Sequence, residues 1–417
     1  MNHLRIQVLR FALPLILLAT VAAGRALAST TNEVGTCMAG FTQFSTIQAA
    51  INASPSGSTI IICPGVYPEQ PVITEPLTLK GVTASGSSAA TIIPPPGGLL
   101  TNATDLDSGY PVAAQVLVLN STGVNISFLT VDGNGNNLSG CGAPDLVGFF
   151  YQNASGTLNT VVARNQILPN PADYGCQNGF GIYVQSNGGT SNLTVESSSI
   201  HNFQKNGITA NDSGTKVNLT GNKVEGQGPW NGAAQNGIQI AFGAKGSAST
   251  NIAFDNIYIP ATYAGVGILV YASSGITLTG NDVASSQLGI SLDSDPTYGS
   301  ADNGVITSNA VIGTQIYDAI DACSSSNTIK DNRVTDAGES GVHIDDECTN
   351  SGNNTVATNN TIYESCAGIL LGGGSGNTVS SNVFDNVAYN TYPGDVCTYP
   401  GRPAAPHRHL SPQPARP

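Results

Sequence analysis

The strongest constraint in this sequence is a short phrase that repeats through its second half. An apolar–x–apolar triplet recurs there, and successive triplets lie 22 to 30 residues apart. A fixed period of this size is typical of a solenoid, in which each repeat buries its apolar face against its neighbours. Side chains alternate along a strand, so each triplet places two side chains in the core and one outside. The triplets begin at Ile208, Ile238, Ile268, Ile290, Ile320, Val342 and Ile369.

Most repeats carry a second short strand that ends in Asn. These residues are Asn222, Asn281, Asn309, Asn332, Asn359 and Asn382; Asn165 fits the same position, and Ser198 takes it in one repeat. Amide side chains both donate and accept, so stacked Asn residues predict a structural hydrogen-bonded ladder. The repeat at residues 251–259 is one residue out of step, at Asp255 or Asn256, which predicts a bulge.

The phrase TIQAAINASPSGSTIIICPGVYPEQPVITEPLTLKGV begins at Thr46. It predicts a short amphipathic helix at residues 44–51, with Ser45 or Thr46 as N-cap, followed by short strands. This phrase resembles the opening of pectin-lyase-like right-handed parallel β-helix proteins, which are exported and mostly uncharacterised. The resemblance implies an all-β, right-handed, single-stranded parallel β-helix. Pairing the strands gives about 11–12 coils, and the helix would cap the open N-terminal end.

The chain divides into four predicted segments. Residues 1–28 have the basic start, apolar run and small-residue end of a secretory signal peptide. Residues 29–43 form a lead-in, residues 44–398 the β-helix domain, and residues 399–417 a Pro-rich disordered tail. No other stretch is apolar enough to span a membrane. We therefore expect a secreted monomer, extracellular or periplasmic.

Charge and cysteine content narrow the function classes. The formal net charge of −13 argues against nucleic acid as a partner. Eight Cys in an exported chain favour four disulfides, whereas the absence of a C-x-x-C pair argues against zinc. Sequence order suggests the pairs Cys37–Cys63, Cys141–Cys176, Cys323–Cys348 and Cys366–Cys397.

Aligning the triplets brings acidic side chains of three successive coils onto one outward face. The catalytic candidates are Asp293, Asp321, His343 and Asp345. Two coils separate Asp293 from Asp345 by about 10 Å, near the carboxylate spacing of inverting glycosidases. Crowded carboxylates raise one another's pKa, as a general acid requires, and a His can shuttle a proton.

Two other interpretations of these acids stay open. Solenoid turns are rich in Asp for turn chemistry alone. Neighbouring carboxylates also suit Ca²⁺, for which the candidate ligands are Asp295, Asp346 and Glu347 in the adjoining turns.

Aromatic residues are the candidates for substrate binding, because ring faces stack on sugar rings. These candidates are Tyr183, Trp230, Tyr271 and Tyr298, of which Trp230 is the only Trp in the chain. The alternative for Trp230 is that it packs its own loop onto the sheet.

No catalytic motif of the resembling families is complete. Among polygalacturonase-like motifs only Asp345-Asp346 is loosely similar, and pectinesterase motifs are absent. A pectate-lyase-like reaction is less supported, because the coils hold only Arg164 and Arg333 as Arg residues. The first hypothesis is a glycosidase-like polysaccharide hydrolase. The alternative is a non-catalytic β-helix, stabilised by Ca²⁺, that binds a polysaccharide, a cell-surface glycan or another surface partner.

Overall fold

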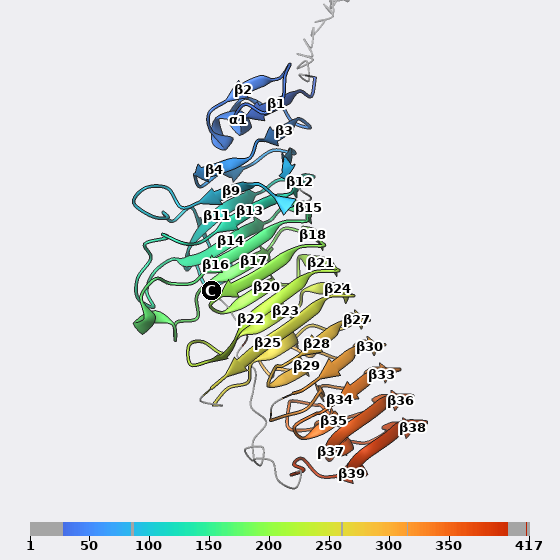
Figure 1. The fold of residues 1–417 in the computed structure, drawn as a ribbon. Helices are drawn as coiled ribbons and strands as arrows, with labels where there is room; N and C mark the ends of the chain where they lie inside the picture. The colour runs from blue at the N-terminus through green and yellow to red at the C-terminus, as the bar shows by residue number, and fades with distance from the viewer. Residues whose placement is uncertain (1–27, 85–86, 260–261, 315, 399–413, 415–417) are drawn as a thin grey trace, which may run out of the picture.

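The computed structural model describes residues 28–84, 87–259, 262–314, 316–398 and 414. The predicted signal peptide before Ala28 and nearly all of the predicted tail lie outside this part of the chain. The chain forms a right-handed parallel β-helix, as the sequence predicts; its strands step regularly from the N-terminal cap to the last coil (Figure 1). No helix in the described residues is long and apolar enough to cross a membrane.

One wall of the solenoid, the ladder sheet, has 14 strands in the described residues. They are β1 (Thr31–Val34), β2 (Thr42–Phe44), β3 (Thr59–Ile62), β6 (Thr78–Gly81), β12 (Val124–Ser127), β15 (Ser155–Asn159), β18 (Ser191–Glu196), β21 (Thr215–Thr220), β24 (Lys245–Ser249), β27 (Thr277–Thr279), β30 (Val305–Thr307), β33 (Thr328–Lys330), β36 (Val356–Thr358) and β38 (Thr378–Ser380). The lead-in thus contributes β1 and β2, and β1 pairs with both β2 and β3.

The other strands form two further walls. The triplet sheet contains β5 (Val72–Ile73), β11 (Pro111–Leu119), β14 (Asp145–Gln152), β17 (Phe180–Gln185), β20 (Asn206–Asn211), β23 (Asn236–Ala241), β26 (Val266–Tyr271), β29 (Leu288–Asp293), β32 (Ile320–Cys323), β35 (Ser340–Ile344) and the second half of β37 (Thr361–Leu371). The flanking sheet contains β4 (Gly65–Pro68), β9 (Ala90–Ile93), β13 (Leu129–Asp132), β16 (Val162–Gln166), β19 (Ser199–Phe203), β22 (Lys223–Trp230), β25 (Ile252–Tyr258), β28 (Asp282–Ala284), β31 (Ala310–Ile312), β34 (Arg333–Thr335), and the first halves of β37 and β39 (Val383–Pro393). The second half of β39 pairs with the second half of β37 and continues the triplet sheet. β10 (Ala103–Thr104) pairs antiparallel with β11 of the triplet sheet. Outside these walls lie β7 (Thr83–Ala84), β8 (Ser87–Ser88) and a 3₁₀ turn at Pro171–Asp173.

The predicted alignment of the triplets is confirmed. Tyr183 pairs with Thr209, which pairs with Gln239, and the same column continues to Asp321 and His343. The two apolar residues of each triplet enter a continuous core that runs the length of the solenoid. Periodicity alone therefore identifies which side chains point away from the core.

The Asn ladder is present, with two members shifted from the prediction. Nδ2 of each ladder Asn donates to Oδ1 of the Asn in the next coil; the Asn222–Asn251 distance is 2.9 Å. The ladder runs through Ser198, Asn222, Asn251, Asn281, Asn309, Asn332, Asn360 and Asn382.

Three assignments from the sequence were wrong. Asn360 rather than Asn359 is the ladder residue of its coil. In the coil between those of Asn222 and Asn281, the ladder residue is Asn251, not Asp255 or Asn256. The residue before the ladder position adopts a left-handed backbone, with φ 57° at Asn359, and so cannot face inward. Asn165 is also left-handed, with φ 63°, and its amide donates to Asp132 instead.

The N-terminal helix α1 (Ile47–Ala53) matches the predicted cap. Thr46 is its N-cap, and the Thr46 hydroxyl accepts from the Ala49 N–H at 3.1 Å. The Glu69 carboxylate accepts from the N–H groups of Ile47 and Gln48, which satisfies two more amides of the first turn. The helix buries Ile47, Ala50 and Ile51 against the first strands.

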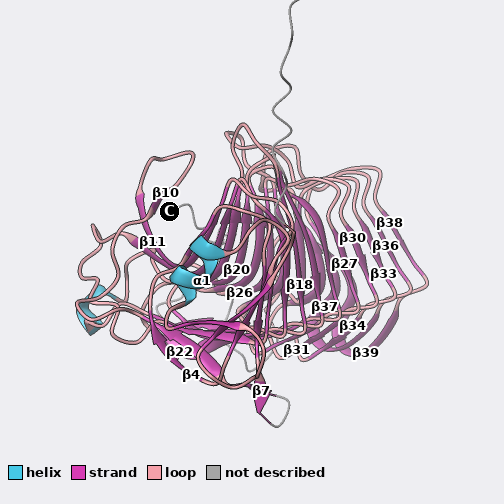
Figure 2. Cartoon of the chain, turned by 90° about the horizontal axis from the view of Figure 1, so that it is seen from above, coloured by secondary structure: helices cyan, strands magenta, loops and turns pink. Residues whose placement is uncertain are grey.

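All four predicted disulfides are confirmed: Cys37–Cys63, Cys141–Cys176, Cys323–Cys348 and Cys366–Cys397. No Cys in the described residues is left as a free thiol. Long loops project from one side of the solenoid when it is viewed along its axis (Figure 2).

Candidate functional site

The predicted catalytic side chains do share one face of the triplet sheet. Ser291 pairs with Asp321 and Asp321 with His343, while Asp293 precedes Cys323 in the next column. However, the expected exposure is wrong, because Asp293, Asp321 and Asp345 are only 1–2% exposed. Ser291 donates to Asp293 at 2.6 Å, and Asp345 accepts from the Glu347 N–H at 2.7 Å. The face is polar but closed.

His343 is held by a carboxylate that sequence reasoning missed. Nδ1 of His343 lies 3.3 Å from Oδ2 of Asp318, whose other oxygen accepts from the Ser340 N–H and hydroxyl. Burial lowers the pKa of His343, but the charges of Asp318 and Asp345 outweigh it and raise this pKa to about 10. His343 is therefore an imidazolium at neutral pH. Asp318 lies in a loop before β32, outside the triplets, so no repeat position marks it.

The C-terminal segment closes the end of the same face. The Cys397 N–H donates to Glu339 at 2.8 Å, and Cys397 is bonded to Cys366 in β37. Burial and the neighbouring Asp318 raise the pKa of Glu339 to about 8. This end of the face thus holds a carboxyl group that titrates near neutral pH.

An open pocket of about 360 Å³ lies at the edge of this face. It is lined by Tyr271, Asp293, Asp295, Glu347 and neighbouring turn residues. The Tyr271 hydroxyl donates to Asp295, which also accepts from two backbone N–H groups of its own turn. Burial raises the pKa of Asp295, but these hydrogen bonds outweigh it and hold the pKa below its ordinary value.

The predicted aromatic candidates of this face differ in exposure. Tyr298 is 48% exposed and packs edge-on against Phe242, which also contacts Tyr271. Tyr183 was expected to expose a ring face, and this was wrong. It is fully buried, stacks on Phe150, and its hydroxyl donates to Asp105.

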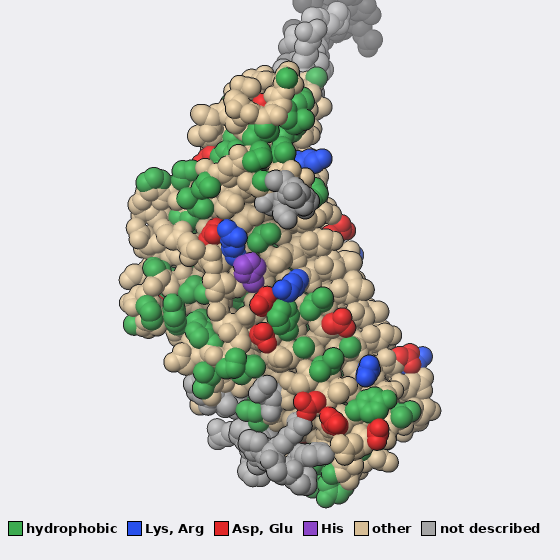
Figure 3. Space-filling view, in the orientation of Figure 1, with side chains coloured by type: hydrophobic (Ala, Val, Ile, Leu, Met, Phe, Trp, Pro, Cys, Tyr) green, Lys and Arg blue, Asp and Glu red, His purple; other side chains and the backbone are tan. Residues whose placement is uncertain are grey.

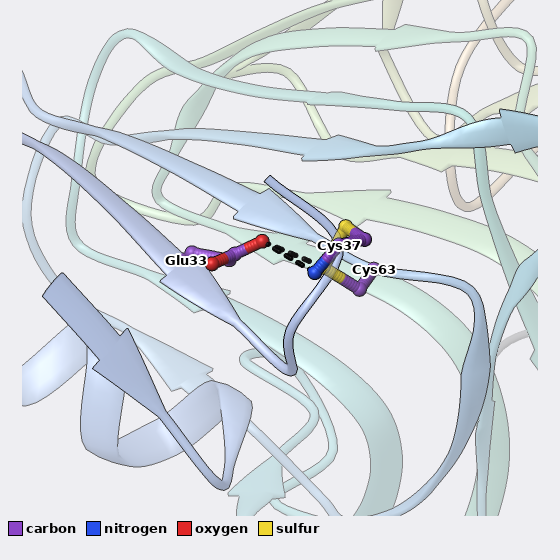
Figure 4. A group of neighbouring side chains, drawn as sticks. All are labelled: Glu33, Cys37 and Cys63. Atoms are coloured by element: carbon purple, nitrogen blue, oxygen red, sulfur yellow. Dashed lines mark hydrogen bonds between the residues drawn. A yellow bond between two sulfur atoms is a disulfide. The ribbon is translucent and has the colours of Figure 1, made fainter. Parts of the chain in front are cut away.

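Two clusters in the described residues bring three metal-type donors within 4.8 Å of one another. Asp318, Asp321 and His343 form one cluster; Asp295, Asp346 and Glu347 form neither. The other is Glu33 with Cys37 and Cys63, whose sulfurs form a disulfide and so provide no thiolate (Figure 4). There, Glu33 accepts from the Cys37 N–H at 2.8 Å, which is a structural role.

A second region, on the flanking sheet, forms an aromatic-walled groove of about 390 Å³. Trp230 ends β22, and its ring centroid lies 5.4 Å from that of Tyr174 in the opposite loop. The groove is lined by Asn134, Asn165, Ile167, Leu168, Pro169, Tyr174, Asn202, Gln227 and Trp230. Of the predicted substrate-binding residues, Trp230 is the one that lines this groove.

The groove floor is a chain of amide side chains from three successive coils. Asn165 donates to Asp132, Asn202 donates to Asn165, and Gln227 donates to Asn202. Asn165 and Asn202 have left-handed backbones, which turn their side chains out of the strands. Gln227 sits where the β22–β25 register shifts between Glu225 and Gly228, a bulge that redirects a side chain.

A row of charged side chains runs beside these amides. Strand register aligns Asp132 with Arg164, Arg164 with His201, and His201 with Glu225. Arg164 pairs with Asp132 at 2.9 Å, and Lys223 pairs with Glu225 at 3.0 Å. Acidic, basic and His side chains lie together on this part of the surface (Figure 3).

The row is electrically balanced. Burial lowers the pKa of His201; Glu225 raises it, while Arg164 and Lys223 lower it further, so the imidazole is neutral at pH 7. Sequence reasoning missed this row because only the triplets were aligned. Arg164 and His201 are rare basic residues in an acidic chain, and aligning the flanking strands as well would have brought them together.

The comparisons with known proteins agree on the fold. A family model described as periplasmic copper-binding protein (NosD) matches residues 234–399. The lacto-N-biosidase of Eubacterium ramulus is 12% identical with a TM-score of 0.57, covering 86% of this chain and 68% of its own. The chain has the right-handed parallel β-helix fold.

Two further parallel β-helix structures are similar. The Dettilon tailspike protein is 14% identical with a TM-score of 0.47 over 80% of this chain, which spans 62% of the tailspike's length. The surface adhesin PfbA of Streptococcus pneumoniae is 14% identical with a TM-score of 0.48, covering 85% of this chain and 89% of its own. No curated protein matches the chain in sequence. At these identities the likeness concerns the fold alone.

The donor atoms of the matched region do not fit copper. Copper sites in proteins use thiolate or thioether sulfur and imidazole nitrogen. Residues 234–399 contain no Met and a single His, His343, and their four Cys are all in disulfides. His343 is protonated and lies with Asp318 and Asp321, a carboxylate-rich set that suits a hard cation better.

Proposed function

We propose that this protein is an exported parallel β-helix that binds a neutral polysaccharide in the Trp230 groove. The observation that carries the proposal is the amide floor of Asn165, Asn202 and Gln227 beneath the rings of Trp230 and Tyr174. Amide groups donate to and accept from sugar hydroxyls, and ring faces stack on the apolar side of a sugar.

The dimensions of the floor support a chain-like ligand. Its three side chains come from three successive coils about 4.8 Å apart, so the floor extends on the order of 10 Å along the solenoid axis. That length accommodates a short stretch of a linear glycan. The four disulfides support an oxidising compartment and hence export.

The charge balance beside the groove favours a neutral sugar over an acidic one. Two ion pairs and a neutral imidazole leave the row without net charge. The chain as a whole carries −13, which repels polyanions. Binding should therefore change little between about 50 and about 500 mM salt, whereas binding of a uronate chain would be salt-dependent.

Trp230 provides a direct assay because it is the only Trp in the chain. Oligosaccharides added to the protein should shift its emission, and calorimetry should give the same dissociation constant. Trp230→Ala and Asn202→Ala should each weaken binding about tenfold or more. Tyr389→Ala is the matched control, since Tyr389 is 51% exposed on the last coil. If neutral glycans bind equally well to all three variants, the groove is not the binding site.

Hydrolysis at the acidic face is the second candidate. The observation that favours it is the pocket beside Tyr271, which is lined by Asp295 and Glu347 and reaches the buried Asp293. In this candidate Asp293, Asp321 and Asp345 provide the acid and base, and His343 balances their charge. Asp321→Asn and Asp345→Asn should abolish release of reducing ends from a neutral polysaccharide. Activity that survives both changes would exclude this site.

A further inference from the structure

We infer that Asp318, Asp321 and His343 bind one divalent cation of the Mn²⁺ class inside the C-terminal coils. One ligand atom of each side chain lies within 4.8 Å of the other two. Two ligands on opposite sides of an ion, each about 2.4 Å from it, are about 4.8 Å apart, so a single ion can reach all three. The inference does not depend on carbohydrate binding at Trp230. It is an alternative to the use of Asp321 and His343 in acid–base catalysis.

The three side chains come from two neighbouring coils. Asp321 lies in β32 and His343 in β35, and the register of these strands places the two residues side by side. Asp318 lies two residues before β32. Ser340, at the start of β35, orients it, because Asp318 Oδ1 accepts from the Ser340 N–H at 3.1 Å and from the Ser340 hydroxyl at 2.6 Å. Metal ligands are regularly oriented by such hydrogen bonds.

The surroundings of His343 are those of a metal-binding histidine. Nδ1 lies 3.3 Å from Asp318 Oδ2, whereas Nε2 is buried and has no hydrogen-bond partner among the described residues. A metal-binding histidine usually gives one ring N–H to a carboxylate or carbonyl and binds the ion through the other nitrogen. Nε2 is therefore the nitrogen available to the ion. The ion takes the place of the Nε2 proton, which passes to solvent.

The site lies within a buried excess of negative charge. Asp318, Asp321, Glu339 and Asp345 are 1–4% exposed, and His343 is 6% exposed. Four ionised carboxylates and one imidazolium sum to a charge of −3, of which protonation of Glu339 removes part in the metal-free chain. Buried charges in proteins are paired or coordinate metal ions, because an isolated charge loses its hydration.

The basic side chains of the C-terminal coils are engaged elsewhere. Residues 262–398 contain one Lys and one Arg. Lys330 lies in β33 on the ladder sheet, 3.6 Å from the Asp331 carboxylate. Arg333 lies in β34 on the flanking sheet, over the ring of Tyr363. A bound cation is therefore the species that can balance the remaining buried charge of the triplet face.

The donor set indicates the class of ion. Two carboxylates and one imidazole combine oxygen with nitrogen, which suits Mn²⁺, whereas Ca²⁺ takes oxygen ligands. The burial of all three side chains is typical of a structural site, which is closed to solvent. We therefore expect the ion to be bound as the chain folds and to be retained against a chelator afterwards.

Metal retention by the full chain tests the inference. The protein is produced with Mn²⁺ in the medium and dialysed against EDTA, and bound Mn²⁺ is counted by mass spectrometry. The unmodified chain should retain about one ion, with pulsed EPR showing coupling to an imidazole nitrogen. Asp321→Asn and His343→Gln should each retain at least about tenfold less. Equal retention by these variants, no Mn²⁺ in the unmodified chain, or retention of Ca²⁺ in place of Mn²⁺ would overturn the inference.

Matched variants separate this site from other ligands of the chain. Asp282→Asn, an exposed acid on the flanking sheet, should keep the ion. His407→Gln with His409→Gln should also keep it, and loss of Mn²⁺ from that double variant would assign the ion to the C-terminal segment instead. Ser340→Ala keeps all three donors but releases Asp318, so it should lower the affinity by about 10–100-fold in competition with a chelator.

The unmodified chain gives a second measurement that does not depend on how the variants fold. Amides of β32 and β35 should exchange hydrogen more slowly in the Mn²⁺-bound chain than in chain produced with Mn²⁺ withheld, because the ion ties these two coils together. Amides of β12, at the other end of the solenoid, should exchange at the same rate in both. Equal exchange in β32 and β35 would refute the site. Neither measurement uses a polysaccharide, so failure here is distinct from failure of the proposed function.

Discussion

Replacing one buried ladder residue, Asn281, should destabilise the solenoid by several kcal/mol. The Asn281 amide donates to Asn309 Oδ1 at 2.9 Å and to the Ala248 carbonyl at 3.0 Å. Its Oδ1 accepts from the Asn251 N–H at 3.0 Å and from the Asn251 amide at 2.9 Å. The side chain is fully buried, so water cannot replace these bonds.

The magnitude follows from the groups that Asn281→Ala leaves without a partner. The Asn251 N–H loses its acceptor, and the Ala248 carbonyl loses this donor. Each buried group left unsatisfied costs about 1–3 kcal/mol, so the expected loss of unfolding free energy is about 2–6 kcal/mol. Asn192→Ala is the matched control, because Asn192 is exposed on β18, and it should change stability by less than about 0.5 kcal/mol.

Urea unfolding followed by circular dichroism measures the global loss. A solenoid is stabilised only between neighbouring coils, so a local defect can open one region before the rest. Hydrogen exchange at the Asn251 amide measures that local opening, and it should accelerate in Asn281→Ala. Unfolding and exchange both within error of the Asn192→Ala control would show that the ladder does not hold the coils together.

Three further predictions concern buried charges and the C-terminal anchor. Burial and Asp105 raise the pKa of Asp145 to about 8. The stabilisation from its protonated carboxyl is therefore complete below about pH 4 and falls by about 1.4 kcal/mol per pH unit between about pH 4 and about pH 8; Asp145→Asn should flatten that slope in urea titrations. The pKa of His343 is raised to about 10, so its stabilisation is complete below about pH 6.5 and lost towards pH 10; His343→Gln should destabilise more at pH 6 than at pH 10. Cys366→Ser with Cys397→Ser should cost about 4 kcal/mol in thermal unfolding, from a 31-residue separation.

The fold was predictable because a solenoid is a one-dimensional repeat. Once the triplets are aligned, each coil has the same register as the one before, and disulfides follow from Cys that fall on neighbouring coils. The ladder errors have a local cause. In the pair Asn359–Asn360 both residues are amides, and only the backbone shows that Asn359 takes the left-handed turn while Asn360 points inward.

The site was only partly predictable, because burial depends on loops that have no period. Alignment brought Asp321 and His343 together correctly, but nothing in the repeat indicates that Asp318 would reach His343. In the same way, the buried state of Tyr183 depends on Asp105, which lies 78 residues earlier in the chain. Aligning the repeats therefore cannot predict contacts that irregular segments make.

The ladder also explains where this solenoid can carry a site. At the turn from the ladder sheet to the flanking sheet, each Asn bonds to the next coil, so the number of residues there cannot change without breaking a buried bond. At the turn from the flanking sheet to the triplet sheet, the described amide chain of Asn165, Asn202 and Gln227 joins three coils, whereas the Asn ladder runs from Asn222 to Asn382. The long loops at residues 133–144 and 167–179 occur at that turn, as does the loop after Trp230. Residues 167–169, Tyr174 and Trp230 wall the Trp230 groove. Since inserted residues are tolerated at that turn, the surface beside it is where binding specificity can change while the core stays intact.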